Sequence, residues 1–316
     1  MLAHSDEYWN LLRCPKTNLP LKLIDSEFLI ADTSHQDQQY KYEIIEGKPV
    51  LVDFSTSILD QTETLTNNAS SVVVRPTRGG IQSIIKRVLT PEKQVTNDNV
   101  KYLISLLKDQ NSEPKVLFIG GGSLGRGMKP FYDDDALKVI GFDIYSSPLV
   151  QFIADDHQIP LANESIDCVV IQVVLEHVLD PSQVVSEIYR VLKPNGLIYA
   201  ETPFLQQVHE GAYDFTRFTE SGHRYLFKNF QLIESGATEG PGTQLLWTID
   251  YFSRSLFRSK TMGKIIKLLF FLVQYLDYCI PKKYWIDSGS DVFFLGRKSD
   301  KTITPQEMIQ HYQGAQ

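Results

Sequence analysis

The sequence predicts an α/β fold with a largely parallel, doubly wound β-sheet, a small β-rich N-terminal module and a helical C-terminal extension. Its 316 residues suffice for one domain of about 200 residues with smaller additions. Four short apolar runs are nearly uninterrupted, as expected of strands that are buried on both faces of a parallel sheet. These runs are 116–120, 138–144, 168–174 and 196–202.

Helical patterns lie between these runs. Residues 98–108 have helical periodicity, and their expected apolar face consists of Val100, Leu103, Ile104 and Leu107. A second helix is expected after Asp180, which can cap it, with Pro181 at its first position and Gln183 at capping-box spacing. Gly196 is expected to take a positive φ between this helix and the last strand.

A glycine-rich turn follows the first apolar run. In VLFIGGGSLGRG, residues 116–127, Gly120, Gly122 and Gly125 have G-x-G-x-x-G spacing, and Asp143 ends the next run 23 residues after Gly120. Glycines let the backbone approach a ligand closely, and an acid at the end of the second strand can bind ribose hydroxyls. The turn therefore predicts a dinucleotide or adenosyl-cofactor site, with a tight turn that binds no ligand as the alternative.

A series of short motifs follows this turn. They are Asp155, Ile159-Pro160, Ile166-Asp167, Leu175-Glu176-His177 and Arg190-Val191-Leu192-Lys193-Pro194-Asn195-Gly196. Over residues 98–235 the series resembles the class I S-adenosylmethionine-dependent methyltransferases, in particular the small-molecule branch called type 11. This resemblance implies a Rossmann-like methyltransferase fold, S-adenosylmethionine as cofactor and methyl transfer as the activity.

The same resemblance implies which residues hold the cofactor. They are Gly120, Gly122 and Gly125 at its methionine part, Asp143 at the ribose, Asp155 and His157 near the adenine, and Gln172 and Val173 along the pocket. The chain departs from the family at Phe118, where many relatives have an acid, and at Gly121, where many have cysteine. Because Phe118 removes one support of the cofactor loop, a relative that no longer binds the cofactor stays an alternative.

Polar and aromatic residues after the last strand are the candidates for the acceptor site. His209 is the candidate general base, because its ordinary pKa lies near neutrality and it follows the strand closely. Bracing of a loop is the equal alternative. Asp214 and Arg217 are expected to form an ion pair, which either orders a loop over the acceptor or is purely structural.

The neighbouring motif YDFTRFTESGHRYLF resembles one found in methyltransferases that serve bacterial surface polysaccharides and other glycans, which implies a sugar or other small hydroxylated acceptor. His177 has the family's place near the pocket rim, with a structural role as the alternative. His223 and Arg224 are expected on the following helix.

The N-terminal segment has its own resemblance, to a small zinc-ribbon-related domain that accompanies several methyltransferases. LLRCPKTNLPLKLI and YKYEIIEGKPVLVDF carry it, but only Cys14 remains of the possible ligands, so a metal-free packing or substrate-orienting module is expected. The predicted organisation is a module at 1–54, a linker at 55–97, a methyltransferase core at 98–248 and the extension at 249–316.

Composition narrows the function further. The net charge of −7 disfavours nucleic-acid binding, which needs clustered Lys and Arg. Three scattered cysteines argue against a disulfide framework or a cysteine-rich metal site, so no metal is expected. The N-terminus lacks the pattern of a secretory signal, which predicts a cytoplasmic protein.

One segment departs from this acidic average. Residues 251–285 contain seven basic residues and one acid, and their longest uncharged stretch is too short to span a bilayer. A basic helix with Leu268, Phe271, Leu272 and Tyr275 on one face would suit peripheral contact with an anionic membrane. Packing on the domain or a contact in a homodimer is the alternative.

The leading interpretation is an S-adenosylmethionine-dependent O-methyltransferase. A non-catalytic scaffold that binds the cofactor, and a nicotinamide-dependent oxidoreductase, are the alternatives from other classes.

Overall fold

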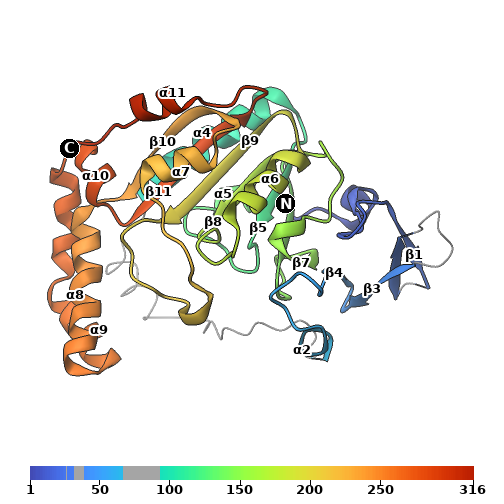
Figure 1. The fold of residues 1–316 in the computed structure, drawn as a ribbon, viewed down its shortest axis with the longest axis horizontal. Helices are drawn as coiled ribbons and strands as arrows, with labels where there is room; N and C mark the ends of the chain where they lie inside the picture. The colour runs from blue at the N-terminus through green and yellow to red at the C-terminus, as the bar shows by residue number, and fades with distance from the viewer. Residues whose placement is uncertain (26, 32–38, 67–92) are drawn as a thin grey trace. The chain divides into compact units, whose positions relative to one another are not determined.

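The computed structural model describes residues 1–25, 27–31, 39–66 and 93–316 (Figure 1). Their contacts divide the chain into two compact units. Unit 1 contains the described residues of Met1–Arg75, Lys101–Gln172 and Asp180–Ile198, and unit 2 contains those of Pro76–Val100, Val173–Leu179 and Tyr199–Gln316.

Unit 1 is built on a parallel sheet, which confirms the predicted α/β fold. The strands lie in the order β7-β6-β5-β8, so the chain proceeds from β5 toward one edge of the sheet and then returns to add β8 on the other side of β5, as in a doubly wound sheet. The pairs β6·β7, β5·β6 and β5·β8 are all parallel. These strands are almost wholly buried, which explains their uninterrupted apolar runs. Their bounds are β5 Lys115–Ile119, β6 Lys138–Asp143, β7 Phe152–Ala154 and β8 Ile166–Gln172.

Short helices and the first part of one long strand complete the parallel part of unit 1. They are α5 Lys129–Asp133, η2 Asp156–Gln158, α6 Pro181–Val191 and β9 Leu192–Pro203. The helix α4 Gln94–Gln110 belongs to unit 2 in its first residues and to unit 1 from Lys101. Of its predicted apolar face, Val100, Leu103 and Leu107 are fully buried. The cap of α6 is also confirmed, because Asp180 accepts hydrogen bonds from the N–H groups of Ser182 and Gln183.

Three local predictions are wrong. Gln183 makes no capping box, since its side chain donates to the carbonyl of His157 instead. The positive φ expected at Gly196 falls instead on Asn195, at 62°, inside β9. Gly196 is needed for a different reason: a Cβ there would lie 2.9 Å from the carbonyl oxygen of Lys193 and 3.2 Å from that of Asp167. The fourth strand ends at Gln172, because Val173 turns into the left-handed region with φ 58°.

The N-terminal part of unit 1 is antiparallel, with β1 pairing with β2, β2 with β3, and β3 with β4, which pairs with β7 in parallel. The Cys14 Sγ lies 3.1 Å from the Tyr42 hydroxyl. Part of the predicted linker forms a helix, α2, and residues 67–92 of it lie outside the described residues. The bounds are α1 Ser5–Tyr8, η1 Trp9–Leu11, β1 Leu21–Ile24, β2 Phe28–Ala31, β3 Tyr40–Ile45, β4 Lys48–Leu51 and α2 Gln61–Thr66.

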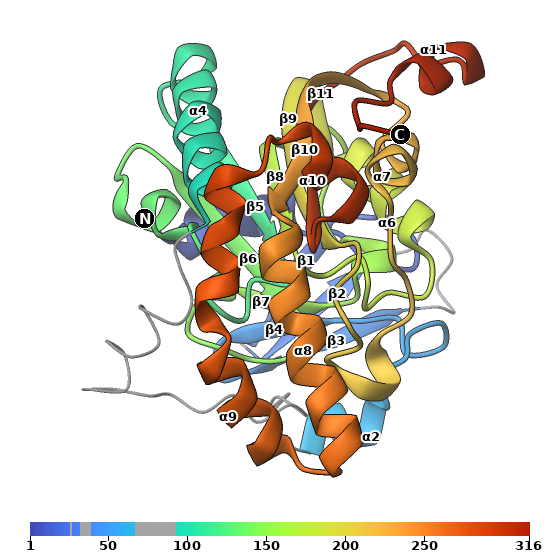
Figure 2. The same cartoon turned by 90° about the vertical axis from the view of Figure 1, so that its left-hand side faces the viewer.

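Unit 2 contains the end of β9 and the antiparallel pair β10·β11, in the order β9-β11-β10. Figure 2 shows α8 and α9 running side by side. Among the described residues, no helix combines the length and apolar character needed to cross a membrane. The elements are η3 Gly211–Tyr213, α7 Glu220–Leu226, β10 Phe230–Glu239, α8 Pro241–Phe257, α9 Lys260–Leu269, η4 Phe271–Cys279, α10 Lys283–Ser288, β11 Asp291–Lys298 and α11 Pro305–Gln310.

Candidate functional site

The glycine turn of unit 1 has a backbone that larger side chains would disrupt. Gly120 follows β5 with φ 68°, in the left-handed region. A Cβ on Gly122 would lie 2.5 Å from Cζ of Tyr145 and 2.6 Å from Oδ2 of Asp143, and one on Gly125 would overlap the Gln172 amide. The glycines therefore permit a close-packed turn at the end of β5.

Asp143 braces this turn from the end of β6. Its carboxylate accepts hydrogen bonds from the N–H groups of Gly122 and Ile144, each at 2.8 Å. The residue is 8% exposed. Asp143 is thus placed where the resemblance expects a ribose-binding acid, and contact with a ribose stays a prediction.

Asp155 and His157 form a connected pair beyond β7. The imidazole Nδ1 of His157 lies 2.7 Å from Oδ1 of Asp155, and the Ser57 hydroxyl donates to Oδ2 at 2.5 Å. Burial raises the pKa of Asp155, but the hydrogen bonds from His157 and Ser57 outweigh it and hold that pKa below its ordinary value. The hydrogen bond to Asp155 raises the pKa of His157.

Of the remaining residues predicted to hold the cofactor, Gln172 belongs to unit 1 and Val173 to unit 2. The Gln172 side chain donates to the Arg126 carbonyl at 3.0 Å, beside the glycine turn. Val173 belongs to unit 2, where its N–H donates to the Glu201 carbonyl at 2.9 Å. Phe118, which stands where relatives have an acid, packs edge-on against Phe131 with ring centroids 5.3 Å apart.

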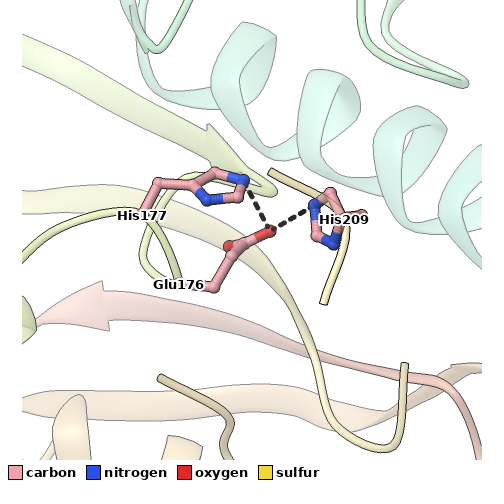
Figure 3. Close-up of side chains that lie close together, drawn as sticks. All are labelled: Glu176, His177 and His209. Carbon is pink, nitrogen blue, oxygen red and sulfur yellow. Dashed lines mark ion pairs between the residues drawn. The ribbon is translucent and has the colours of Figure 1, made fainter. Parts of the chain in front are cut away.

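Unit 2 brings together Glu176, His177 and His209 (Figure 3), here called the Glu-His cluster. Oε1 of Glu176 lies 3.5 Å from Nε2 of His177 and 3.8 Å from Nε2 of His209. Glu176 is 0% exposed, and neither of its carboxylate oxygens has a hydrogen-bond partner among the described residues. Burial raises the pKa of this carboxyl to about 8.

Backbone contacts hold the loop after β9 against Glu176. The N–H groups of Phe215 and Thr216 donate to the Glu176 carbonyl at 2.8 and 3.3 Å. The Nδ1 of His177 lies 2.6 Å from the Tyr213 carbonyl. Since a carbonyl only accepts, this nitrogen carries the proton and leaves the neutral Nε2 with a lone pair.

The predicted ion pair between Asp214 and Arg217 is confirmed. Arg217 contacts both carboxylate oxygens, with Nη2 donating to Oδ2 at 2.9 Å, and its Nε donates to the Gln206 carbonyl at 2.9 Å. Asp214 also accepts from the His209 N–H at 2.8 Å. Burial raises the pKa of Asp214, but the hydrogen bonds from Arg217 and His209 bring it down to about 2. The pair thus stays charged and orders the segment that carries His209.

His223 and Arg224 lie on α7, as predicted, and both are buried. Burial lowers the pKa of His223 to about 3, and Arg224 donates to the Phe227 carbonyl. Both residues therefore belong to the packing of unit 2.

Glu176 is the site residue to which the sequence interpretation assigned no role. The available signal was an acid directly before His177, in the segment after an expected parallel strand. Its partner His209 lies 32 residues beyond His177, so that only the folded chain brings the three side chains together. The expectation of no metal was based on the three cysteines, whereas this set of possible ligands contains no cysteine.

Comparison with known proteins matches residues 117–200 to a family model described as a methyltransferase domain. A 51-residue stretch is 43% identical to an uncharacterized 37.1 kDa protein in transposon TN4556 of Streptomyces fradiae, covering 16% of this chain and 15% of that relative. The chain thus spans a small part of the curated relative that it matches.

Several solved structures are similar at low sequence identity. A putative sarcosine dimethylglycine methyltransferase from Galdieria sulphuraria has 17% identity and a TM-score of 0.44, covering 65% of this chain and 86% of that one. Haemonchus contortus phosphoethanolamine N-methyltransferase 2, in complex with S-adenosylmethionine, has 16% identity and a TM-score of 0.42, covering 64% and 52%. A putative methyltransferase from Bacillus halodurans has 16% identity and a TM-score of 0.41, covering 64% and 99%.

Proposed function

Because residues 117–200 form a class I S-adenosylmethionine-dependent methyltransferase domain, we propose that the protein transfers a methyl group to an oxygen atom of a sugar, a glycan or another small hydroxylated acceptor. The observation that carries this proposal is the Glu-His cluster, which supplies groups able to activate a hydroxyl. Two of its members, Glu176 and His177, come four and five residues after the last residue of β8 in the sequence.

In this reaction the bond between the methyl carbon and the sulfonium sulfur breaks as the bond to the acceptor oxygen forms, and S-adenosylhomocysteine leaves. The hydroxyl loses its proton. Alignment of the two reactants supplies much of the acceleration, and removal of the proton supplies the rest. His209 is the cluster residue through which the hydroxyl is activated, with Asp214 and Arg217 ordering its loop.

The acceptor class is supported by the loop after β9, where YDFTRFTESGHRYLF resembles glycan-modifying methyltransferases. A calorimetric titration with S-adenosylmethionine, S-adenosylhomocysteine and NAD separates this proposal from a nicotinamide enzyme. A screen of hydroxylated acceptors with labelled cofactor then separates an enzyme from a non-catalytic scaffold. Cofactor binding without transfer to any sugar or small hydroxyl compound would contradict the proposed activity.

Replacing Asp143 by alanine is expected to weaken S-adenosylmethionine binding by about 1.5–3 kcal/mol, the cost of losing hydrogen bonds to a charged group. This corresponds to a roughly 10- to 150-fold rise in Kd, measured by calorimetry. Asp133→Ala is the matched control, because Asp133 is an exposed acid that pairs with Lys129, four residues before it. Unchanged affinity in a folded Asp143→Ala protein would remove Asp143 from the cofactor site.

The C-terminal helices are the proposed place of contact with an anionic membrane surface. Exposed apolar side chains gather on α8, α9 and η4, where Arg258, Lys260 and Lys264 are also exposed. Lys267 is less available, because its ammonium lies 3.7 Å from the centroid of the Trp247 ring. The apolar residues are Phe252, Leu256, Phe257, Ile265, Leu268, Leu269, Leu272 and Leu276, each at least 47% exposed.

The prediction of a single helix with Leu268, Phe271, Leu272 and Tyr275 on one face is wrong. The helix α9 ends at Leu269 and continues as the 3-10 helix η4. Phe271 and Tyr275 contact each other there, with ring centroids 6.4 Å apart, whereas Leu268 and Leu272 are exposed. Attachment to a membrane surface would therefore involve α8, α9 and η4 together. It would hold the enzyme at the cytoplasmic leaflet, near lipid-linked glycans.

Purified protein is expected to sediment with anionic vesicles but not with neutral vesicles, and high salt is expected to release it. Lys264→Glu should lower the bound fraction at least about fivefold, given about 1 kcal/mol for each basic residue near the surface. Lys301→Glu, which makes the same charge change at another exposed position of unit 2, should bind normally. No sedimentation at low salt would leave these helices as packing or as a dimer contact.

A further inference from the structure

We propose that Glu176, His177 and His209 bind a divalent transition-metal cation. The carboxylate and the two imidazoles each offer one ligand atom, and these atoms all lie within 4.8 Å of one another. Two histidines and one carboxylate are a ligand set used for Zn²⁺ and for Fe²⁺ in proteins.

The two carboxylate oxygens of Glu176 in this cluster accept no hydrogen bond among the described residues. Glu176 is 0% exposed, so water does not solvate its carboxylate, and both oxygens lack a hydrogen-bond partner within the described part of the chain. Burying a carboxylate without hydrogen bonds is costly unless a charge compensates it. Arg217, the nearby cation, is already used by Asp214 and by the Gln206 carbonyl. A bound cation would satisfy Glu176.

The two imidazoles turn the appropriate nitrogen toward Glu176 (Figure 3). The Tyr213 carbonyl fixes the proton of His177 on Nδ1, so its Nε2 is an unprotonated ligand atom. Nε2 of His209 faces Glu176, and its Nδ1 lies 3.4 Å from Oδ2 of Asp214 but makes no hydrogen bond among the described residues, so a small rotation of the ring would bring the two together. A carboxylate or carbonyl beyond each histidine is the usual arrangement around metal ligands, because it orients the ring and raises its basicity.

The distances suit a cation after small shifts of the side chains. Ligand atoms about 2.1 Å from a tetrahedral ion lie about 3.4 Å apart, and the two distances from Glu176 to the histidines are 3.5 and 3.8 Å. Three protein ligands leave at least one coordination position free, as in catalytic rather than structural zinc sites. The cluster can therefore hold a cation that also contacts a small molecule.

A chemical role for this cation in methyl transfer rests on the proposed function. The binding of the cation to the Glu-His cluster does not depend on that function. A cation beside the acceptor oxygen lowers the pKa of the hydroxyl, so that the proton can leave to solvent before the methyl group arrives. His209 would then act as a ligand that positions the cation. Its role as a general base stays a prediction, and the two roles differ in whether activity needs metal.

The test uses Co²⁺ as probe and the full-length protein after treatment with a chelator, without cofactor or acceptor. We expect one equivalent of Co²⁺ to bind, with visible absorption bands of nitrogen and oxygen coordination and competition by Zn²⁺. Glu176→Gln, His177→Ala and His209→Ala should each abolish stoichiometric binding. Asp214→Asn should weaken binding by about 10- to 100-fold, the usual effect of a residue beyond the ligands.

His157→Ala is the matched control, because His157 also pairs with a carboxylate but lies outside the cluster. It should bind Co²⁺ like the original protein. Glu176→Gln is nearly isosteric and leaves the buried position uncharged, so loss of binding in this folded variant is not an unfolding effect. The proposal is overturned if no stoichiometric binding occurs, or if the ligand variants bind as well as His157→Ala. Methyl transfer that survives chelation would refute the catalytic role alone and leave the proposed function intact.

Discussion

Replacing His209 by alanine is expected to lower the turnover number by about 10²- to 10⁴-fold, the usual contribution of a group that assists proton removal. The affinity for S-adenosylmethionine should stay nearly unchanged, because His209 is not among the residues predicted to hold the cofactor. Single-turnover kinetics with labelled cofactor measure the first quantity, and calorimetry measures the second.

His4→Ala is a suitable control, since it removes an exposed histidine of unit 1. It should leave both quantities as they are. Equal losses of cofactor affinity and turnover in His209→Ala would show instead that His209 braces its loop, the structural alternative raised by the sequence. Restoration of activity by added imidazole would support direct participation of the side chain.

Replacing Lys93 by methionine is expected to lower the free energy of unfolding by about 3–5 kcal/mol, the cost of removing one partner from a buried ion pair. The ammonium of Lys93 lies 2.9 Å from Asp291, 3.6 Å from Glu239 and 3.8 Å from Glu201, and its side chain is 6% exposed. Burial raises the pKa of Asp291, but Lys93 outweighs it and holds that pKa below its ordinary value. Without Lys93, these carboxyl groups of unit 2 lose their compensating charge.

Urea unfolding measured by circular dichroism gives this free energy, and Lys129→Met provides the matched comparison. Lys129 pairs with Asp133, but its side chain is 70% exposed, so solvent screens the pair and little change is expected. A Lys93→Met protein as stable as the Lys129→Met protein would mean that the carboxyl groups around Lys93 are neutral in the folded state.

Much of unit 1 was predictable, because its signals are local. The strands β5, β6 and β8 appear as apolar runs since both faces of each strand are buried. Asp180 caps α6 through the N–H groups of its immediate neighbours, and the glycines and Asp143 meet across adjacent parallel strands. Where the prediction missed, contacts between residues far apart in the sequence were involved. A hydrogen bond to Glu201 accompanies the turn at Val173, and the Asp167 carbonyl crowds position 196.

The sequence by itself determined the α/β class, the cofactor turn and the family resemblance, because strand burial, helix caps and glycine spacing depend on residues close together in the chain. Only the tertiary structure decided that Glu176 is buried without a partner, that His177 and His209 face it, and that Lys93 compensates carboxyl groups from β9, β10 and β11. Those properties depend on desolvation and on distances between residues tens to almost two hundred positions apart, which no local pattern records.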